Sequence, residues 1–263
     1  MSEIRLETQS LSRHFGALIA VQGIDFKLAA GARHALIGPN GAGKTTFINL
    51  LTGVLPPSSG RVLLGGHDIT SKAQAERVKL GIARTFQINR LFRGLSVLEN
   101  VCMAMSERAG AARSMFYPAG RRTDIIDEAM QLLQTLKLAD TARHRVSELP
   151  YGRQRLVELA ITIGLKPEVL LLDEPAAGVP SAESHIILDA IERLPEHIAV
   201  LIIEHDMDVV FRFAKRVTVI VSGSIFAEGT PREIEANQQV REIYLGQAGQ
   251  DAHQATHQGV QHG

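Results

Sequence analysis

Short apolar runs alternate with longer helical segments along most of the chain. Residues 4–9 and 21–28 alternate apolar and polar side chains, which is typical of half-buried strands. Further strands are predicted at residues 33–37, 61–64, 82–87, 169–172 and 199–203. Residues 217–221 and 224–227 flank Ser222-Gly223, a turn sequence, and so predict a hairpin.

The segments between these strands carry a helical period. Helices are predicted at residues 45–51, 151–165, 181–194 and 206–214, and over 97–138 with a looser stretch at 109–122. Six apolar residues would share one face of the last helix in that stretch: Ile125, Ile126, Ala129, Leu132, Leu133 and Leu136. Alternating strands and helices predict an α/β fold with a mostly parallel core sheet covered on both faces, into which a helical subdomain is inserted.

One loop stands where a strand turns into a helix and reads G-x-x-x-x-G-K-T. Its residues are Gly38, Pro39, Asn40, Gly41, Ala42, Gly43, Lys44, Thr45 and Thr46. Glycines allow the backbone to approach a phosphate, and the amide N–H groups at the helix N-terminus attract anions. Lys44 is expected on the β- and γ-phosphates of a nucleotide and the Thr45 hydroxyl on Mg²⁺.

Composition narrows the function classes. Acidic and basic residues balance at 28 each, so no global charge favours nucleic acid. Cys102 is the only cysteine, which excludes a disulfide, and we interpret it as a small buried hydrophobe. No apolar run has the length of a membrane span and the N-terminus has no signal-peptide pattern, so we expect a cytosolic chain unless a partner brings it to a membrane.

Polar residues follow several of the predicted strands. Asp173 and Glu174 end an apolar run, and Gln87 and His205 each follow another strand. In phosphate-loop enzymes a strand-end aspartate orients Mg²⁺, and an adjacent carboxylate can activate water. Gln87 and His205 are placed where they could reach a γ-phosphate.

In this order, the phosphate loop, Gln87, the glycine-containing helix start at 151, Asp173-Glu174 and His205 resemble the nucleotide-binding subunit of ATP-binding cassette (ABC) transporters. The resemblance covers residues 4–245. It implies an antiparallel β subdomain beside the core sheet and a helical subdomain at about 91–165. It also implies that two subunits close head to tail on two ATP molecules.

The resemblance also assigns roles to individual residues. Phe15 would stack on adenine, and Gln87 would sense Mg²⁺ and the membrane partner. Asp173 would orient Mg²⁺, Glu174 would be the catalytic base, and His205 would contact the γ-phosphate. Tyr151, Gly152 and Arg153 would belong to the signature motif that completes the partner's ATP site.

Two positions depart from the family pattern. The signature reads Leu149-Pro150-Tyr151-Gly152-Arg153, so proline stands where serine is usual and offers neither hydroxyl nor N–H. Arg153 adds a cation that could compensate. Pro180 stands where an aspartate is usual. Both departures suit a heterodimer with unequal ATP sites, while a homodimer stays possible.

The finer resemblance is to importers of branched-chain amino acids. It rests on residues 83–87 and 91–92, the Tyr-Gly signature, residues 174–178 and the end at 240–246. Such a chain would lie at the cytoplasmic face of the cell membrane with two permeases, a second ATPase and a solute-binding protein. Urea or amide uptake is an alternative, and a soluble non-transport ABC ATPase is a less favoured one. A phosphate-loop kinase or GTPase lacks support, because neither an acceptor-binding lid nor a guanine-reading motif is present.

Three further features have competing interpretations. Residues 246–263 predict a disordered polar tail, whose histidines His253, His257 and His262 are more simply solvated than metal-binding. Arg113, Arg121 and Arg122 suggest a solvated loop rather than a lipid contact. The apolar residues after Gln87 (Leu91, Phe92, Leu95, Val97 and Leu98) either receive a permease helix or pack the helical subdomain.

Overall fold

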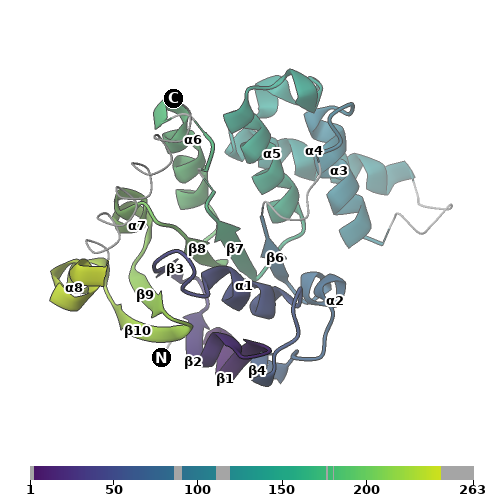
Figure 1. Cartoon of the computed structure of the whole chain (residues 1–263). Coiled ribbons are helices and arrows are strands. Elements are labelled where there is room, and N and C mark those ends of the chain that lie inside the picture. The colour runs from purple at the N-terminus through teal and green to yellow at the C-terminus, as the bar shows by residue number, and fades with distance from the viewer. Residues whose placement is uncertain (1–2, 86–90, 111–118, 176, 180, 244–263) are drawn as a thin grey trace, which may run out of the picture.

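The computed structural model describes residues 3–85, 91–110, 119–175, 177–179 and 181–243, without the side chains of 119–122 and 181–184. Two sheets lie beside a separate group of helices (Figure 1). A six-stranded sheet has the order β10-β9-β3-β8-β7-β6, and a four-stranded sheet has the order β2-β1-β4-β5. The expected α/β class with a mostly parallel core sheet, an antiparallel β part and helices is confirmed.

The core sheet is parallel except at one edge. Its strands are β3 (Arg33–Ile37), β6 (Ile82–Arg84), β7 (Val169–Asp173), β8 (Ala199–Ile203), β9 (Arg216–Val221) and β10 (Ser224–Gly229). The antiparallel β9–β10 pair confirms the predicted hairpin. Successive residues of the central strands enter different hydrophobic clusters, as Leu170 and Leu171 do on β7. Both faces of the sheet are therefore covered, as parallel sheets require.

The four-stranded sheet is antiparallel and packs on one face of the core sheet. Its strands are β1 (Ile4–Phe15), β2 (Leu18–Ala29), β4 (Ser59–Leu64) and β5 (His67–Asp68). The first two are longer than the alternation predicted, and they turn at Gly16, whose φ is +60°. Phe26 contacts Phe47 of the first helix edge to face, with ring centroids 5.6 Å apart.

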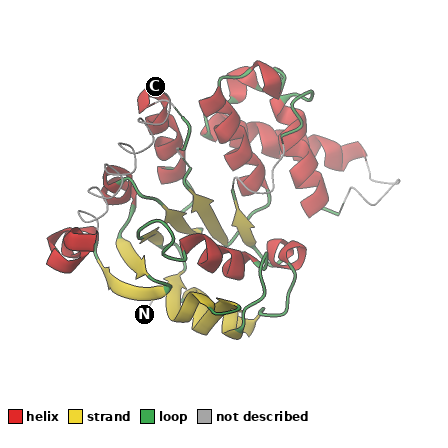
Figure 2. Ribbon diagram, in the orientation of Figure 1, coloured by secondary structure: helices red, strands yellow, loops and turns green. Residues whose placement is uncertain are grey.

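The helices cover the sheets and build the helical subdomain (Figure 2). They are α1 (Lys44–Thr52), α2 (Gln74–Lys79), α3 (Val97–Arg108), α4 (Ala119–Thr135), α5 (Tyr151–Gly164), α6 (Ser181–Glu192), α7 (Met207–Phe213) and α8 (Pro231–Ala236). Two 3₁₀ turns, Ala139–Thr141 and Val146–Glu148, link α4 to α5. The helices α2 and α8 were not predicted from the sequence.

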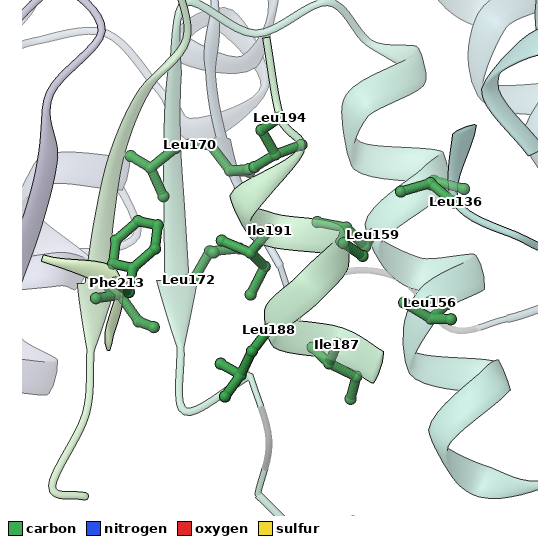
Figure 3. Close-up of a cluster of buried hydrophobic side chains, with 14 of the residues drawn as sticks. Leu136, Leu156, Leu159, Leu170, Leu172, Ile187, Leu188, Ile191, Leu194 and Phe213 are labelled. Carbon is green, nitrogen blue, oxygen red and sulfur yellow. The ribbon is translucent and has the colours of Figure 1, made fainter. Parts of the chain in front are cut away.

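The helical subdomain is joined to the core sheet through α6. Figure 3 shows α6 between strand β7 and helix α5, with Ile191 toward Leu172 on one side and Leu156 and Leu159 of α5 on the other. The apolar face predicted for α4 is buried at four of its six positions and half-buried at Leu132. Ile126 is 44% exposed, so its assignment to that face was wrong. It follows Ile125 directly, and adjacent residues of a helix point about 100° apart.

A buried arginine closes the C-terminal end of α1. The Arg77 side chain is 1% exposed, and its Nη1 donates to the carbonyl oxygens of Leu50 at 2.7 Å and Leu51 at 2.9 Å. The remaining N–H groups reach the carbonyls of Thr70 and Lys72. This cation therefore binds helix carbonyls that have no partner within the helix.

No helix in the described ranges is both long and apolar enough to cross a bilayer.

Candidate functional site

The phosphate loop connects β3 to α1 and is packed tightly against neighbouring backbone. Gly38 has φ +154°, and a Cβ there would lie 2.1 Å from the carbonyl oxygen of Ile220 on β9. Gly43 has φ +99°, and its Cβ would lie 2.3 Å from the carbonyl oxygen of Ala20 on β2. Both sheets thus hold the loop, and only glycine fits at these two positions.

Lys44 begins α1 and turns its ammonium back over the loop. Its Nζ donates to the carbonyl oxygens of Gly38 at 2.5 Å and Pro39 at 2.9 Å. Burial lowers the pKa of Lys44, while the nearby carboxylates of Glu174 and Asp173 act to raise it. The N-cap, Gly43, offers no side-chain acceptor to the first turn. The helix N-terminus and the ammonium together favour an anion at the loop.

The two predicted acidic residues stand at the carboxyl end of β7. Asp173 ends the strand, and its carboxylate oxygen Oδ2 is paired with the guanidinium of Arg84, the last residue of β6. Glu174 has φ +45°, a strained value for a residue with a side chain, and its N–H donates to the carbonyl of Ile203 at 3.0 Å. The strand ends therefore fix the direction of both carboxylates.

His205 follows β8 and meets Glu174. Its Nδ1 lies 3.5 Å from Oε1 of Glu174. The residue before it, Glu204, is buried, and burial raises the pKa of that carboxyl to about 7. The His205 backbone N–H donates to Oε2 of Glu204 at 3.3 Å. Sequence reasoning gave Glu204 no role, although an acidic residue at the end of a fully apolar strand was a visible signal.

Sequence reasoning also missed Arg84. Besides Asp173, its guanidinium contacts Asn49 of α1, with Nη1 donating to Oδ1 at 2.7 Å. A basic residue inside the apolar strand 82–84 is a signal, because a buried guanidinium needs partners. The sequence did not identify those partners, which lie 35 and 89 positions away.

The donor set fits a hard divalent cation bound together with phosphates. Thr45 is exposed at the first turn of α1 and offers a hydroxyl, and Asp173 offers a carboxylate. Within the described residues no group of three His, Cys, Asp or Glu side chains forms a metal cage. Mg²⁺ typically takes one or two protein oxygens and completes its shell with phosphate and water. Thr45 and Asp173 supply ligands of that kind.

The other predicted nucleotide contacts lie in two further places. Phe15 sits at the tip of the β1–β2 hairpin, 43% exposed, with the Arg13 guanidinium 4.6 Å from its ring centroid. Tyr151 and Gly152 begin α5 in the helical subdomain, after the N-cap Pro150, which caps no N–H with its side chain. The Arg153 guanidinium donates to Asp140 at 2.8 Å, so this cation already has a carboxylate partner.

The loop after Glu174 lies against the start of α5. Gly178 has φ +73°, and a Cβ on it would lie 3.4 Å from the Tyr151 ring. Two residues singled out from the sequence for this site, Gln87 and Pro180, lie outside the described residues, as do Arg113 and the tail from 244. The structure thus brings Lys44, Asp173, Glu174 and His205 together at the carboxyl ends of β3, β7 and β8.

Comparison with known proteins agrees with this geometry. Residues 21–177 match the family model described as ABC transporter, and residues 224–249 match the model described as branched-chain amino acid ATP-binding cassette transporter. The curated relatives include two ATP-binding proteins of high-affinity branched-chain amino acid transport. LivG of Escherichia coli and BraF of Pseudomonas aeruginosa are each 37% identical over 94% of this chain and all of the relative.

Solved structures agree as well. An ATP-binding cassette of an ABC transporter in its ADP conformation superposes with a TM-score of 0.80 at 32% identity, covering 92% of this chain and 99% of the other. A nucleotide-free ATP-binding cassette gives 0.79 at 31% identity, over 92% and 98% of the two chains. The chain therefore belongs to the ATP-binding cassette family of ABC transporters, in the group of branched-chain amino acid transport ATP-binding proteins.

Proposed function

We propose that this chain is the ATP-hydrolysing subunit of an importer for branched-chain amino acids or a related small polar or carboxylate solute. The supporting observation is that Lys44, Asp173, Glu174 and His205 lie together beside the phosphate loop. That loop requires glycine at positions 38 and 43. The solute rests on the names of the relatives, which are branched-chain amino acid transport proteins.

The residues of the site divide the reaction among them. The amides of the loop and the Lys44 ammonium bind the β- and γ-phosphates of ATP. Glu174 orients the attacking water and accepts its proton, at a position fixed by its backbone bond to Ile203. His205, 3.5 Å from Glu174, is placed to contact the γ-phosphate on the same side.

Mg²⁺ is the cofactor we propose, held by Thr45 and Asp173. Gln87, which lies outside the described residues, is the third residue that we propose for it. When bound, it neutralises negative charge on the β- and γ-phosphates. Phe15 is proposed to stack on the adenine. The guanidinium of Arg13 already lies against the Phe15 ring, so it would also lie near an adenine stacked there.

The ATP-binding chains of this family work in complexes with membrane components, and we propose the composition of this one. It comprises two permeases, a second and different ATPase, and a solute-binding protein, with this chain peripheral at the cytoplasmic face. Tyr151, Gly152 and Arg153 would complete the ATP site of the other ATPase. Residues 1–245 would form the ATPase domain, with the helical part at about 91–165, and 246–263 a polar tail.

The surface proposed for the permease is a groove along α3. A cavity of about 540 Å³ is lined by Leu95, Glu99, Cys102, Met103, Ser106 and Glu107. Met103 is 45% exposed and Phe92, before the helix, is 56% exposed, whereas Val97 is buried. Leu91, Leu98 and Cys102 pack partly against the core. The apolar stretch after Gln87 thus serves both packing and, we propose, docking.

The test is affinity purification of this chain from detergent-solubilised native membranes. Two polytopic permeases and a second ATPase in the eluate would support the proposal. A solute-binding assay on the binding protein associated with those permeases would then separate branched-chain amino acids from urea or amides. Recovery of the chain alone, or with ribosomal or DNA-repair proteins, would refute the transport role and leave the ATPase role standing.

A further inference from the structure

A permanent cation lies buried against the aspartate proposed to hold Mg²⁺. The Arg84 side chain is 1% exposed, and its Nη2 contacts Oδ2 of Asp173 while its Nη1 donates to Oδ1 of Asn49. One guanidinium therefore links β6, β7 and α1. Burying a charge is costly unless it is paired and hydrogen-bonded, so both partners are needed to hold it there.

Joining the strands does not require this side chain. Strands β6 and β7 already pair in parallel through their backbones, with Ile82, Ala83 and Arg84 opposite Val169, Leu170 and Leu171. Nor does α1 need Arg84 at its C-terminal end, where Arg77 binds the carbonyls of Leu50 and Leu51. The contact that remains specific to Arg84 is the one that orients the Asp173 carboxylate.

Asn49 connects this pair to the other proposed metal ligand. It stands four positions after Thr45 on α1, and residues four apart lie on the same side of a helix. The first turn of α1 thus presents the Thr45 hydroxyl, and the next turn presents the amide that holds Arg84. The series Thr45, Asn49, Arg84 and Asp173 fixes the two proposed ligands relative to each other.

We propose that Arg84, anchored by Asn49, is a positioning residue for the divalent cation that accompanies ATP. By contacting Oδ2, it sets the rotation of the Asp173 carboxylate and leaves Oδ1 for the metal or a metal-bound water. Groups that orient a ligating carboxylate in this way commonly change metal affinity by about 10- to 100-fold. This inference rests on the Mg²⁺ site of the proposed function.

The test measures metal binding separately from hydrolysis, on the full chain. Mn²⁺ serves as a paramagnetic probe and is titrated into protein that is saturated with a non-hydrolysable ATP analogue. Binding is measured as the loss of the electron paramagnetic resonance signal of free Mn²⁺. Binding of a fluorescent ATP analogue in EDTA reports the nucleotide site without metal. The variants are Arg84→Lys, Arg84→Met and Asn49→Ala. The matched control is Arg77→Lys, also a buried arginine bonded to α1, but one that stands on α2 and contacts only carbonyls at the far end of α1.

We expect Arg84→Met and Asn49→Ala to raise the Mn²⁺ concentration at half-saturation about tenfold, with metal-free nucleotide binding within about twofold of wild type. Arg84→Lys keeps the positive charge but cannot contact Asp173 and Asn49 at the same time as a guanidinium does. Its Mn²⁺ concentration at half-saturation should lie between those of wild type and Arg84→Met. Arg77→Lys lowers the melting temperature and leaves Mn²⁺ binding unchanged. If Arg84→Met does not fold, Arg84→Lys and Asn49→Ala carry the test.

Two results would overturn the inference in distinguishable ways. Wild-type Mn²⁺ binding by folded Arg84 and Asn49 variants would make Arg84 a structural ion pair and leave the proposed metal site intact. Absence of Mn²⁺ uptake by the wild-type complex would remove the metal site itself.

Discussion

Oε1 of Glu174 lies 3.5 Å from Nδ1 of His205, although the two residues follow different strands and stand 31 positions apart. The pairing follows from the parallel register of β7 and β8, which places Asp173 opposite Ile203. Glu174 follows Asp173 directly and His205 follows Ile203 by two positions, so both leave the sheet at the same edge. The water activation proposed for Glu174 and the γ-phosphate contact proposed for His205 would thereby lie side by side.

Glu174→Gln is expected to lower ATP hydrolysis by about 100-fold or more, because a general base typically contributes a factor of 10² to 10⁴. Nucleotide binding should stay at the wild-type level, since the amide keeps the shape of the carboxylate. Phosphate release and binding of a fluorescent ATP analogue measure the two effects. Hydrolysis at the wild-type rate would remove Glu174 from the role of base.

Lys44→Ala should weaken ATP binding at least about tenfold, which corresponds to roughly 1.4 kcal/mol. The cause is the loss of an ammonium that the carbonyls of Gly38 and Pro39 hold at the loop, where we propose that the phosphates bind. Lys27→Ala is the control, because that lysine is 64% exposed on β2. Equal affinities of the two variants would argue against phosphate contact by Lys44.

Gly43→Ala tests whether the shape of the loop depends on glycine. The new Cβ would meet the Ala20 carbonyl oxygen at 2.3 Å, so the loop must move and ATP binding should be lost. Gly66→Ala is matched, with φ +80° but open space around the Cβ, and should cost only about 1–2 kcal/mol of stability. Isothermal titration with ATP and thermal unfolding separate the two effects. Normal ATP binding by Gly43→Ala would contradict the packing argument.

Leu95→Glu should leave ATPase activity of the isolated chain unchanged and abolish transport by the assembled complex, because it places a charge in the α3 groove. Solute uptake into vesicles and ATP hydrolysis in solution measure the two. Phe226→Glu, an exposed apolar position on β10, is the control and should keep transport. If Leu95→Glu also loses ATPase activity, Leu95 serves core packing instead.

Two buried groups should oppose each other in the pH dependence of stability. Burial lowers the pKa of His34 from 6.5 to about 4, so between these values the unfolded chain binds more protons and stability falls as pH falls. Burial raises the pKa of Glu204 from 4.5 to about 7, so there the folded chain binds more protons and stability falls as pH rises. Each contribution is on the order of 3 kcal/mol.

Urea unfolding of single variants at pH 5 and pH 7 would separate these contributions. Between these pH values, Glu204→Gln should gain more stability on going to pH 7 than wild type does, and His34→Gln should lose stability over the same change. His34 also accepts or donates a bond with Thr218 at 2.8 Å, so glutamine keeps a polar partner there. Identical pH slopes in all three proteins would refute the assignments.

The order of strands and helices was predictable because each element shows a periodic pattern of apolar and polar residues over several positions. Strands of the core sheet and helix α5 lie within a few residues of their predicted limits. The helix α2 was not predicted, because its sequence, Gln74 to Lys79, is polar and short and its one buried side chain is a charged arginine. Burial of Arg77 depends on carbonyls that only the folded helix α1 presents.

The candidate site likewise contains residues that the sequence identified and residues that it did not. Gly43, Lys44, Asp173 and His205 were identifiable because each has a fixed place beside a strand or helix end. Arg84 and Glu204 were not, because their significance lies in partners and burial rather than in spacing. A single polar residue in an apolar run indicates that something compensates it, and the fold alone shows what does.

The position of Arg77 changes how α1 acts on a bound anion. A nine-residue helix spans about 13 Å, so its two ends influence the same phosphate with opposite sign. With a buried guanidinium on the carbonyl end, the negative pole is neutralised from within the protein and is shielded from salt. The positive N-terminal end of α1 then attracts a nucleotide without being offset by a negative C-terminal end. Ionic strength would weaken ATP binding chiefly through the solvent-facing end at Thr45.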